Sequence, residues 1–201
     1  MILASTSPTR RALLTAAGLA FEAIRPEVDE DRERERMLPA LAGEQLWLVA
    51  HKLATVKARN VANRSDVAET PHLVIGADQV LVVDGQVLTK PGSRDGVIAT
   101  LRTLRGRTHT LHSSVVLVGP NGWVWNETQT AELTMRDLTD AEIERYADRA
   151  GEAIHGCVGA YQIEGLGMTL FDRIVGDHTT ILGLPMLPLL AELRRHEVTT
   201  P

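Results

Sequence analysis

Short apolar runs alternate along the chain with segments of helical periodicity, and this interleaving constrains the fold more than any other feature. The runs of strand length are residues 1–4, 21–24, 73–75 and 80–83. The segments with helical spacing of apolar side chains are residues 9–19, 38–62, 93–107, 139–149 and 182–196. Strands interleaved with helices are typical of an α/β fold with a mixed sheet.

One apolar stretch, "LVIGADQVLVVDGQVLTKP", carries an acidic side chain where a core strand is expected. Its pattern predicts a strand that breaks at Gly76, Asp78 at the strand end, and then a hairpin through the Asp84-Gly85 turn. A buried carboxylate is costly unless it is paired, holds a metal or acts as a base. A turn or cap aspartate after a glycine is an equally common alternative, so both interpretations stay open here.

Composition argues against a nucleic-acid partner. Aromatic residues make up 3% of the 201-residue chain, which supplies few side chains on which bases could stack. The formal net charge is -5 and no long Lys/Arg tract occurs, so long-range electrostatics do not favour a polyanion. A small basic pocket remains compatible with these numbers.

Cysteine usage and hydropathy indicate a reducing, aqueous compartment. The single cysteine, Cys157, excludes an internal disulfide and a cysteine-rich zinc site. The first residues, "MILASTSPTRR", do not have the charge order of a signal peptide, and no apolar run has the length of a membrane span. We therefore expect a cytoplasmic protein with no membrane association.

The N-terminal "ASTSPTRR" leads from a strand through a hydroxyl-rich turn into a helix start. Backbone N–H groups at such a position favour anions, and Ser5 and Arg10 add a hydroxyl donor and a cationic fork suited to phosphate. A helix cap followed by surface arginines explains the same residues. The Gly-Lys-Thr/Ser ending of a Walker A loop is missing.

The remaining polar residues carry weaker signals. The seven histidines have no ligand-like spacing, and Cys157 has no evident base beside it. Lys52 fits a surface residue that extends its charge from a helix, and Lys90 fits an exposed lysine at a strand end. Taken one at a time, none of these residues identifies a reaction.

Taken in order, the motifs are specific. The set "LASTSPTRR", "AHKLA", "IGADQVLVVDGQVLTKP", "LRGRTHTLHSSV", "VGAYQIEGLGMTLFDRIVGD" and "LGLPM" resembles the Maf family of nucleoside triphosphate pyrophosphatases across nearly the whole chain. Within that family the chain looks most similar to the branch that acts on 7-methyl-GTP. The features that suggest this branch are "ADQV", the cysteine in "HGCVGAY", and the glutamate in "EGLGMTLF".

The resemblance implies cleavage between the α and β phosphates, with a nucleoside monophosphate and pyrophosphate as products. It also implies a divalent cation, Mg²⁺ or Mn²⁺, and a homodimer. The implied fold is a single domain over residues 1–201 of the inosine-triphosphatase type. In that type an elongated mixed sheet is flanked by helices, and two lobes enclose a cleft.

Site residues follow from the same resemblance. Asp78 matches the catalytic proton acceptor, and a carboxylate there can also hold a metal, as can Glu30. The positions matching the phosphate-binding residues are Ser5, Arg10, Lys52 and Lys90. The positions matching the residues that select the base are Thr9, Gln79 and Glu164.

Glu164 has a physical rationale as a base reader. A carboxylate can accept two hydrogen bonds from the N–H groups on the Watson–Crick edge of guanine, and the positive charge of a 7-methylated ring favours it further. Thr9 differs from the arginine of the pyrimidine branch and from the large aromatic residue frequent in the methyl-GTP branch. Turnover of dTTP, UTP or CTP is the alternative substrate class within the same family, and a non-enzymatic regulator of septum formation is the alternative function.

Overall fold

The computed structural model describes residues 1–41, 43–68 and 72–198. The chain forms two compact units, each built from several segments. Unit 1 comprises residues 1–79, 112–129 and 177–201, and unit 2 comprises residues 80–111 and 130–176. The single-domain organisation and the cleft between lobes stay predictions.

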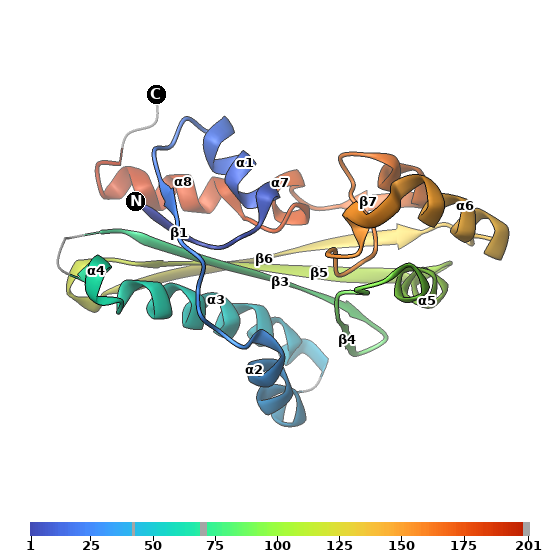
Figure 1. Ribbon diagram of the computed structural model, residues 1–201, viewed down its shortest axis with the longest axis horizontal. Helices are drawn as coiled ribbons and strands as arrows, with labels where there is room; N and C mark the ends of the chain where they lie inside the picture. Colours follow the sequence, from blue (N-terminus) through green and yellow to red (C-terminus); the bar gives the residue numbers. More distant parts are fainter. Residues whose placement is uncertain (42, 69–71, 199–201) are drawn as a thin grey trace. The chain divides into compact units, whose positions relative to one another are not determined.

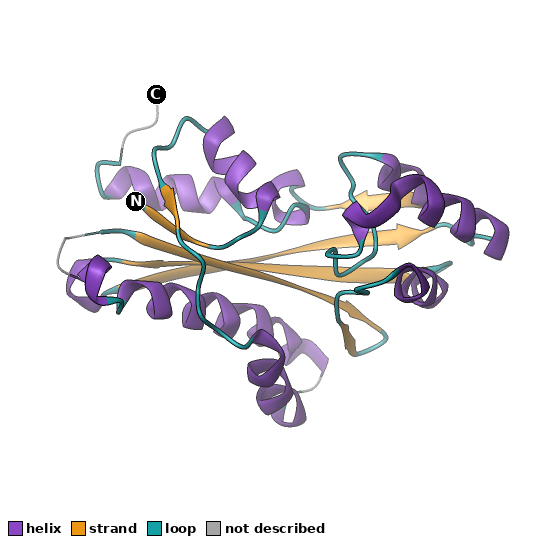
Figure 2. Ribbon diagram, viewed as in Figure 1, coloured by secondary structure: helices purple, strands orange, loops and turns teal. Residues whose placement is uncertain are grey.

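Strands and helices interleave along the described chain (Figures 1 and 2). The strands are β1 (Ile2–Ala4), β2 (Glu22–Ala23), β3 (Val74–Val83), β4 (Gln86–Leu88), β5 (Thr108–Val118), β6 (Val124–Met135) and β7 (Phe171–Val175). The α-helices are α1 (Pro8–Ala16), α2 (Glu30–Met37), α3 (Trp47–Ala62), α4 (Ser65–Ala68), α5 (Arg94–Leu104), α6 (Asp140–Ala150), α7 (His178–Ile181) and α8 (Met186–Arg195). Short 3₁₀ helices are η1 (Leu38–Ala40), η2 (Gly43–Leu46), η3 (Pro120–Gly122), η4 (Gly151–Ile154) and η5 (Leu166–Leu170).

Within the described residues the strands form one seven-stranded mixed sheet, in the order β2-β1-β3-β5-β6-β7, with β4 paired to β3. β1 is parallel to both of its neighbours, and its last residue, Ala4, pairs with Gly76 of β3. β4 and β7 add antiparallel pairs at β3 and β6. The predicted α/β fold with a mixed sheet flanked by helices is confirmed.

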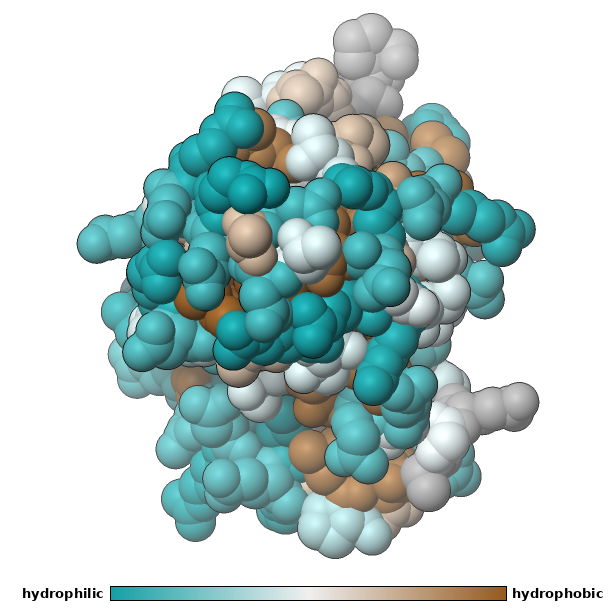
Figure 3. Space-filling model, turned by 90° about the vertical axis from the view of Figure 1, so that its right-hand side faces the viewer, coloured by the Kyte–Doolittle hydropathy of each residue, from teal (hydrophilic) through white to brown (hydrophobic). Residues whose placement is uncertain are grey.

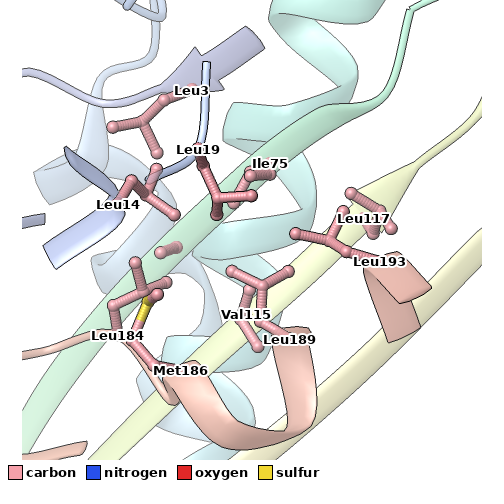
Figure 4. Close-up of a cluster of buried hydrophobic side chains, with 11 residues drawn as sticks. Leu3, Leu14, Leu19, Ile75, Val115, Leu117, Leu184, Met186, Leu189 and Leu193 are labelled. Atoms are coloured by element: carbon pink, nitrogen blue, oxygen red, sulfur yellow. The ribbon is translucent and has the colours of Figure 1, made fainter. Parts of the chain in front are cut away.

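The two faces of the sheet in unit 1 carry separate apolar clusters, because side chains alternate along each strand. On one face, leucines of α1 and α8 pack against a set drawn from three strands, namely Leu3, Ile75, Ala77, Val115 and Leu117 (Figure 4). On the other face, Ala54, Ala58 and Val61 of α3 pack against Ile2, Ala4, Val74, Val116 and Val118. Residues of opposite parity in β1, β3 and β5 therefore meet different helices.

The predicted break at Gly76 is wrong, because β3 runs without interruption from Val74 to Val83. A Cβ built on Gly76 would lie 2.2 Å from Ala54 O and 2.7 Å from Ala58 Cβ of α3. The glycine therefore permits a close approach between strand and helix, and it does not end the strand. As a consequence Asp78 lies inside β3 and not at its end.

Two further local features follow from residues close together in the chain. The helix predicted at residues 139–149 is α6, and Thr139 and Glu142 form a capping box at its N-terminus. In unit 1, the turn between β5 and β6 passes through Asn121 and Gly122, which both have positive φ. In unit 2, His109 of β5 is buried and its Nε2 lies 2.7 Å from the Tyr161 hydroxyl.

Two charged or polar segments contain helices that the sequence patterns did not settle. The segment around residues 26–36 was compatible with a loop or a helix, and it forms α2 with Asp29 as N-cap. Part of the polar stretch that follows α3 forms α4, although the interleaving did not predict a helix there. Hydrophilic residues cover most of the face that Figure 3 shows. Within the described ranges, no helix has the length and hydropathy needed to cross a membrane.

Candidate active site

The turn between β1 and α1 places Ser5 and Arg10 together. The Ser7 side chain caps α1 by accepting a hydrogen bond from the Arg10 backbone N–H at 3.4 Å, and Pro8 occupies the first turn, where it needs no donor. Ser5 is buried just beyond the last residue of β1. The sequence thus fixes the first turn of α1 beside the carboxyl end of a parallel strand, where α/β folds commonly bind ligands.

Arg10 is held by three acceptors. Its Nε donates to the carbonyl of Gly183 at 2.9 Å, and its Nη1 donates to the carbonyl of Ala77 at 2.9 Å and to Ser5 Oγ at 3.4 Å. Burial lowers the pKa of the guanidinium, while the negative charges of Asp78 and Glu30 act in the opposite direction. The two N–H groups on Nη2 are not engaged in these three bonds.

Asp78 points toward α3, as its parity with Val74 and Gly76 requires. Its Oδ1 lies 2.6 Å from Lys57 Nζ, and both side chains are almost fully buried, at 7% and 5% exposure. Glu30, at the start of α2, places Oε1 2.9 Å from the same ammonium. The centre therefore consists of one buried lysine between two carboxylates.

Lys57 was not among the predicted site residues, although its spacing could have revealed it. It follows Val49 and Leu53 at intervals of four, so it continues the buried stripe of α3. A lysine on such a stripe is rarely buried unless it is paired. Lys52, the predicted phosphate-binding lysine, lies off this stripe and is exposed.

Gln79 and Thr9, two of the predicted base-selecting residues, also lie in unit 1. Gln79 follows Asp78 in β3 and therefore faces the opposite side of the sheet. There its Nε2 contacts Ser113 Oγ at 2.8 Å and two carbonyls of α7. Thr9 is half-buried in the first turn of α1. The structure does not test the base-selecting role of either residue, which stays a prediction.

The other two predicted residues, Lys90 and Glu164, are exposed and lie in unit 2. The charges of both residues affect the Cys157 thiol. Burial raises the pKa of this thiol, the negative charge of Glu164 raises it further, and the positive charge of Lys90 lowers it. A partly buried thiol with a raised pKa is a poor nucleophile, in keeping with the absence of an evident base beside Cys157 in the sequence. The predicted phosphate and base contacts of Lys90 and Glu164 stay predictions.

The carboxylates of unit 1 fit the divalent cation that the family resemblance implies. Asp78 Oδ2 is buried and accepts no hydrogen bond within the described residues, so it has lone pairs left for a hard cation. Over the same residues there is no group of three or more His, Cys, Asp and Glu side chains that could hold a metal unaided. Mg²⁺ is commonly bound by one or two carboxylates together with substrate phosphates, and Glu30 with Asp78 matches that arrangement.

This set of groups suits a polyphosphate. Arg10 and Lys57 supply positive charge, Ser5 supplies a hydroxyl, and the helix start of α1 adds backbone N–H groups. Asp78 supplies a carboxylate that can take a proton or hold a metal. The structure thus brings Ser5, Arg10, Glu30 and Asp78 together as predicted, and adds Lys57.

Comparisons with known proteins agree with this chemistry. A family model described as "Maf-like protein" matches residues 1–196. A protein from Nitrobacter winogradskyi named "Nucleoside triphosphate pyrophosphatase" is 48% identical over 96% of this chain and 92% of its own length. A protein from Rhizobium meliloti named "7-methyl-GTP pyrophosphatase" is also 48% identical, over 96% of this chain and 94% of its own length.

Among solved structures, a Mycobacterium abscessus protein described as a nucleoside-triphosphatase, dITP/XTP pyrophosphatase, covers 100% of this chain and 98% of its own. The sequence identity is 16% and the TM-score is 0.44. A score this low supports no conclusion about the chain beyond those already drawn from its sequence relatives.

Proposed function

The chain belongs to the Maf family, and from this premise we propose that it is a nucleoside triphosphate pyrophosphatase with a preference for 7-methyl-GTP. The reaction cleaves the bond between the α and β phosphates and releases a nucleoside monophosphate and pyrophosphate. Relatives with both names, at 48% identity over 96% of the chain, support the activity and make the methylated nucleotide the first substrate to test.

The observation that carries the proposal is the buried Asp78–Lys57 pair, which Glu30 joins at 2.9 Å, in the electrostatic neighbourhood of Arg10. We assign Asp78 as the acceptor of the proton from the attacking water, with Lys57 at 2.6 Å keeping its Oδ1 in place. Lys57 and Arg10 offset the charge of the phosphates and stabilise the charge that develops on them in the transition state. Lys57 thereby takes a role that the family resemblance implied for Lys52.

Glu30 and Asp78 would hold the divalent cation. When bound, such an ion would offset phosphate charge and make the leaving pyrophosphate more stable. Ser5 lies 3.4 Å from Arg10 Nη1 and would donate its hydroxyl to a phosphate oxygen.

Base choice rests on Glu164 of unit 2, which is exposed. Its carboxylate would accept hydrogen bonds from N1–H and the 2-amino group of guanine, and the charge on a 7-methylated ring strengthens that contact. Hypoxanthine lacks the 2-amino group, and pyrimidines present a mixed donor and acceptor edge. A pocket that hydrogen-bonds its substrate in this way rejects analogues that leave its polar groups unpaired.

The test is pyrophosphate release from 7-methyl-GTP, GTP, ITP, dTTP, UTP and CTP with Mg²⁺ or Mn²⁺. We expect 7-methyl-GTP to be the best substrate and Asp78→Asn to abolish turnover. Glu164→Gln should reduce the preference for 7-methyl-GTP over UTP, whereas Glu152→Gln, an exposed glutamate of the same unit, should leave it unchanged. Faster turnover of pyrimidines would overturn the base assignment, and no turnover of any nucleotide would refute the enzymatic function.

A further inference from the structure

Gln79 is an immediate neighbour of Asp78 in β3, yet the two side chains serve opposite faces of the sheet. Asp78 contacts Lys57 of α3, whereas Gln79 has the parity of Ile75 and Ala77, which pack on the side of α1 and α8. There the Gln79 Nε2 lies 3.1 Å from the carbonyl of Thr180 and 3.0 Å from that of Ile181. The side chain thus joins β3 to the helix α7.

A second strand strengthens this connection. Ser113 of β5 is fully buried, accepts from Gln79 Nε2 at 2.8 Å and donates its hydroxyl to the Thr180 carbonyl at 2.7 Å. The Thr180 carbonyl also receives the backbone N–H of Gly183 at 3.0 Å. The Thr180 carbonyl, in the last turn of α7, therefore accepts hydrogen bonds from β3, from β5 and from the backbone of Gly183.

This turn carries one of the two carbonyls that hold Arg10. The guanidinium spans from Ala77 O, two residues before Gln79 in β3, to Gly183 O, three residues after Thr180. A Cβ built on Gly183 would lie 3.5 Å from Arg10 Nη2 and 3.7 Å from the Gln79 amide carbon, so the three groups are in contact range. The spacing of the two acceptors determines where the guanidinium points.

We propose that Gln79, together with Ser113, is a positioning residue for Arg10. By bonding the Thr180 and Ile181 carbonyls, Gln79 fixes the turn of residues 180–183 against β3. The Gly183 and Ala77 carbonyls then stay at the separation that aims the guanidinium at the phosphates. This inference rests on the proposed function, because it takes Arg10 as a phosphate-binding residue.

The same contacts limit what Gln79 can do for the base. Its amide nitrogen has two hydrogens, and three acceptors of the protein lie within 3.1 Å of it. Neither hydrogen is left for a nucleobase. An effect of the Gln79 amide nitrogen would therefore act through Arg10 and change all nucleotides alike, and a direct base contact would have to use Oε1.

A ligand without a base separates positioning from base reading. The probe is inorganic tripolyphosphate, measured by calorimetry in metal-free buffer so that turnover does not enter. Gln79→Met keeps the size of the side chain and removes both donors, and we expect it to weaken binding roughly tenfold, as does Ser113→Ala. The double variant Gln79→Met, Arg10→Met should bind tripolyphosphate no more weakly than Arg10→Met alone. Both substitutions remove the same interaction, that of the positioned guanidinium with the phosphates.

Gln129→Met is the matched control. Gln129 accepts a bond from the Thr180 hydroxyl at 2.9 Å but does not join β3 to the turn, so its loss should leave tripolyphosphate binding at the wild-type level. Thermal unfolding of each variant identifies any that fail to fold, and Ser113→Ala then serves in place of Gln79→Met.

Three outcomes would overturn the proposal. The first is tripolyphosphate binding at the wild-type level by both Gln79→Met and Ser113→Ala. The second is a double variant that binds more weakly than Arg10→Met by the full factor lost in Gln79→Met. A changed ratio of 7-methyl-GTP to UTP turnover in Gln79→Met, with tripolyphosphate binding intact, would make Gln79 a direct base reader. Pyrophosphate release by the wild-type protein, measured separately, shows whether the proposed function itself stands.

Discussion

Replacing Lys57 with methionine tests the electrostatic centre of the site. Methionine keeps much of the aliphatic stem but removes the ammonium that lies 2.6 Å from Asp78 and 2.9 Å from Glu30. Asp78, whose side chain is 7% exposed, is left as a buried charge without its partner. We therefore expect the variant to lose both activity and stability.

The magnitude follows from burial. Removing one partner of a buried ion pair costs about 3–5 kcal/mol of unfolding free energy. Glu30 is 34% exposed, so solvent screens its pairing and the loss of that contact adds less than about 1 kcal/mol. For a chain of this size the total corresponds to a fall in Tm on the order of 10 °C.

Thermal and urea unfolding measure the effect, with Lys52→Met as the control. Lys52 lies on the same helix but is exposed, so the same substitution there should change stability by no more than about 0.5 kcal/mol. Adding Asp78→Asn to Lys57→Met should restore about 1–3 kcal/mol, because no unpaired charge remains. Equal stability of the two lysine variants would refute the buried pair.

Three further predictions concern packing, pH and capping. Gly76→Ala should lower the unfolding free energy by about 1–3 kcal/mol, because the new Cβ would lie 2.2 Å from Ala54 O; Gly156→Ala, where no atom lies within 4 Å, should be near neutral in the same urea titration. Burial lowers the pKa of His109 to about 4 from 6.5, so the unfolded chain takes up this proton first and stability should fall by up to about 3 kcal/mol between pH 6.5 and 4. Unfolding of His109→Leu across that range should show a shallower slope, and an unchanged slope would contradict the assignment. Thr139→Ala should cost about 1 kcal/mol in thermal unfolding through loss of the α6 cap.

Local chemistry made much of this structure predictable from the sequence. The first turn of α1 and the helix α6 depend on residues close together in the chain, and both match the prediction. Asp78 stood out because an acid inside an apolar run needs a partner. The nature of that partner was not local, since Lys57 comes from another element.

The misplaced details have tertiary causes. Gly76 was interpreted as a break because glycine weakens strands, but its role depends on the approach of α3, which the sequence of β3 does not show. Lys57 has no place in the motifs that indicate Lys52, and its burial against Asp78 becomes visible only in the folded chain. The contacts of Gln79 with Ser113 and Thr180 join residues far apart in sequence, so only the folded sheet brings them together.

The most direct test of the central claim identifies the bond that is cleaved. Phosphorus NMR of 7-methyl-GTP incubated with the protein and Mg²⁺ distinguishes pyrophosphate from inorganic phosphate. We predict 7-methyl-GMP and pyrophosphate from the wild-type protein and no products from Asp78→Asn. Release of inorganic phosphate with a nucleoside diphosphate, or equal turnover by Asp78→Asn, would contradict a pyrophosphatase centred on Asp78.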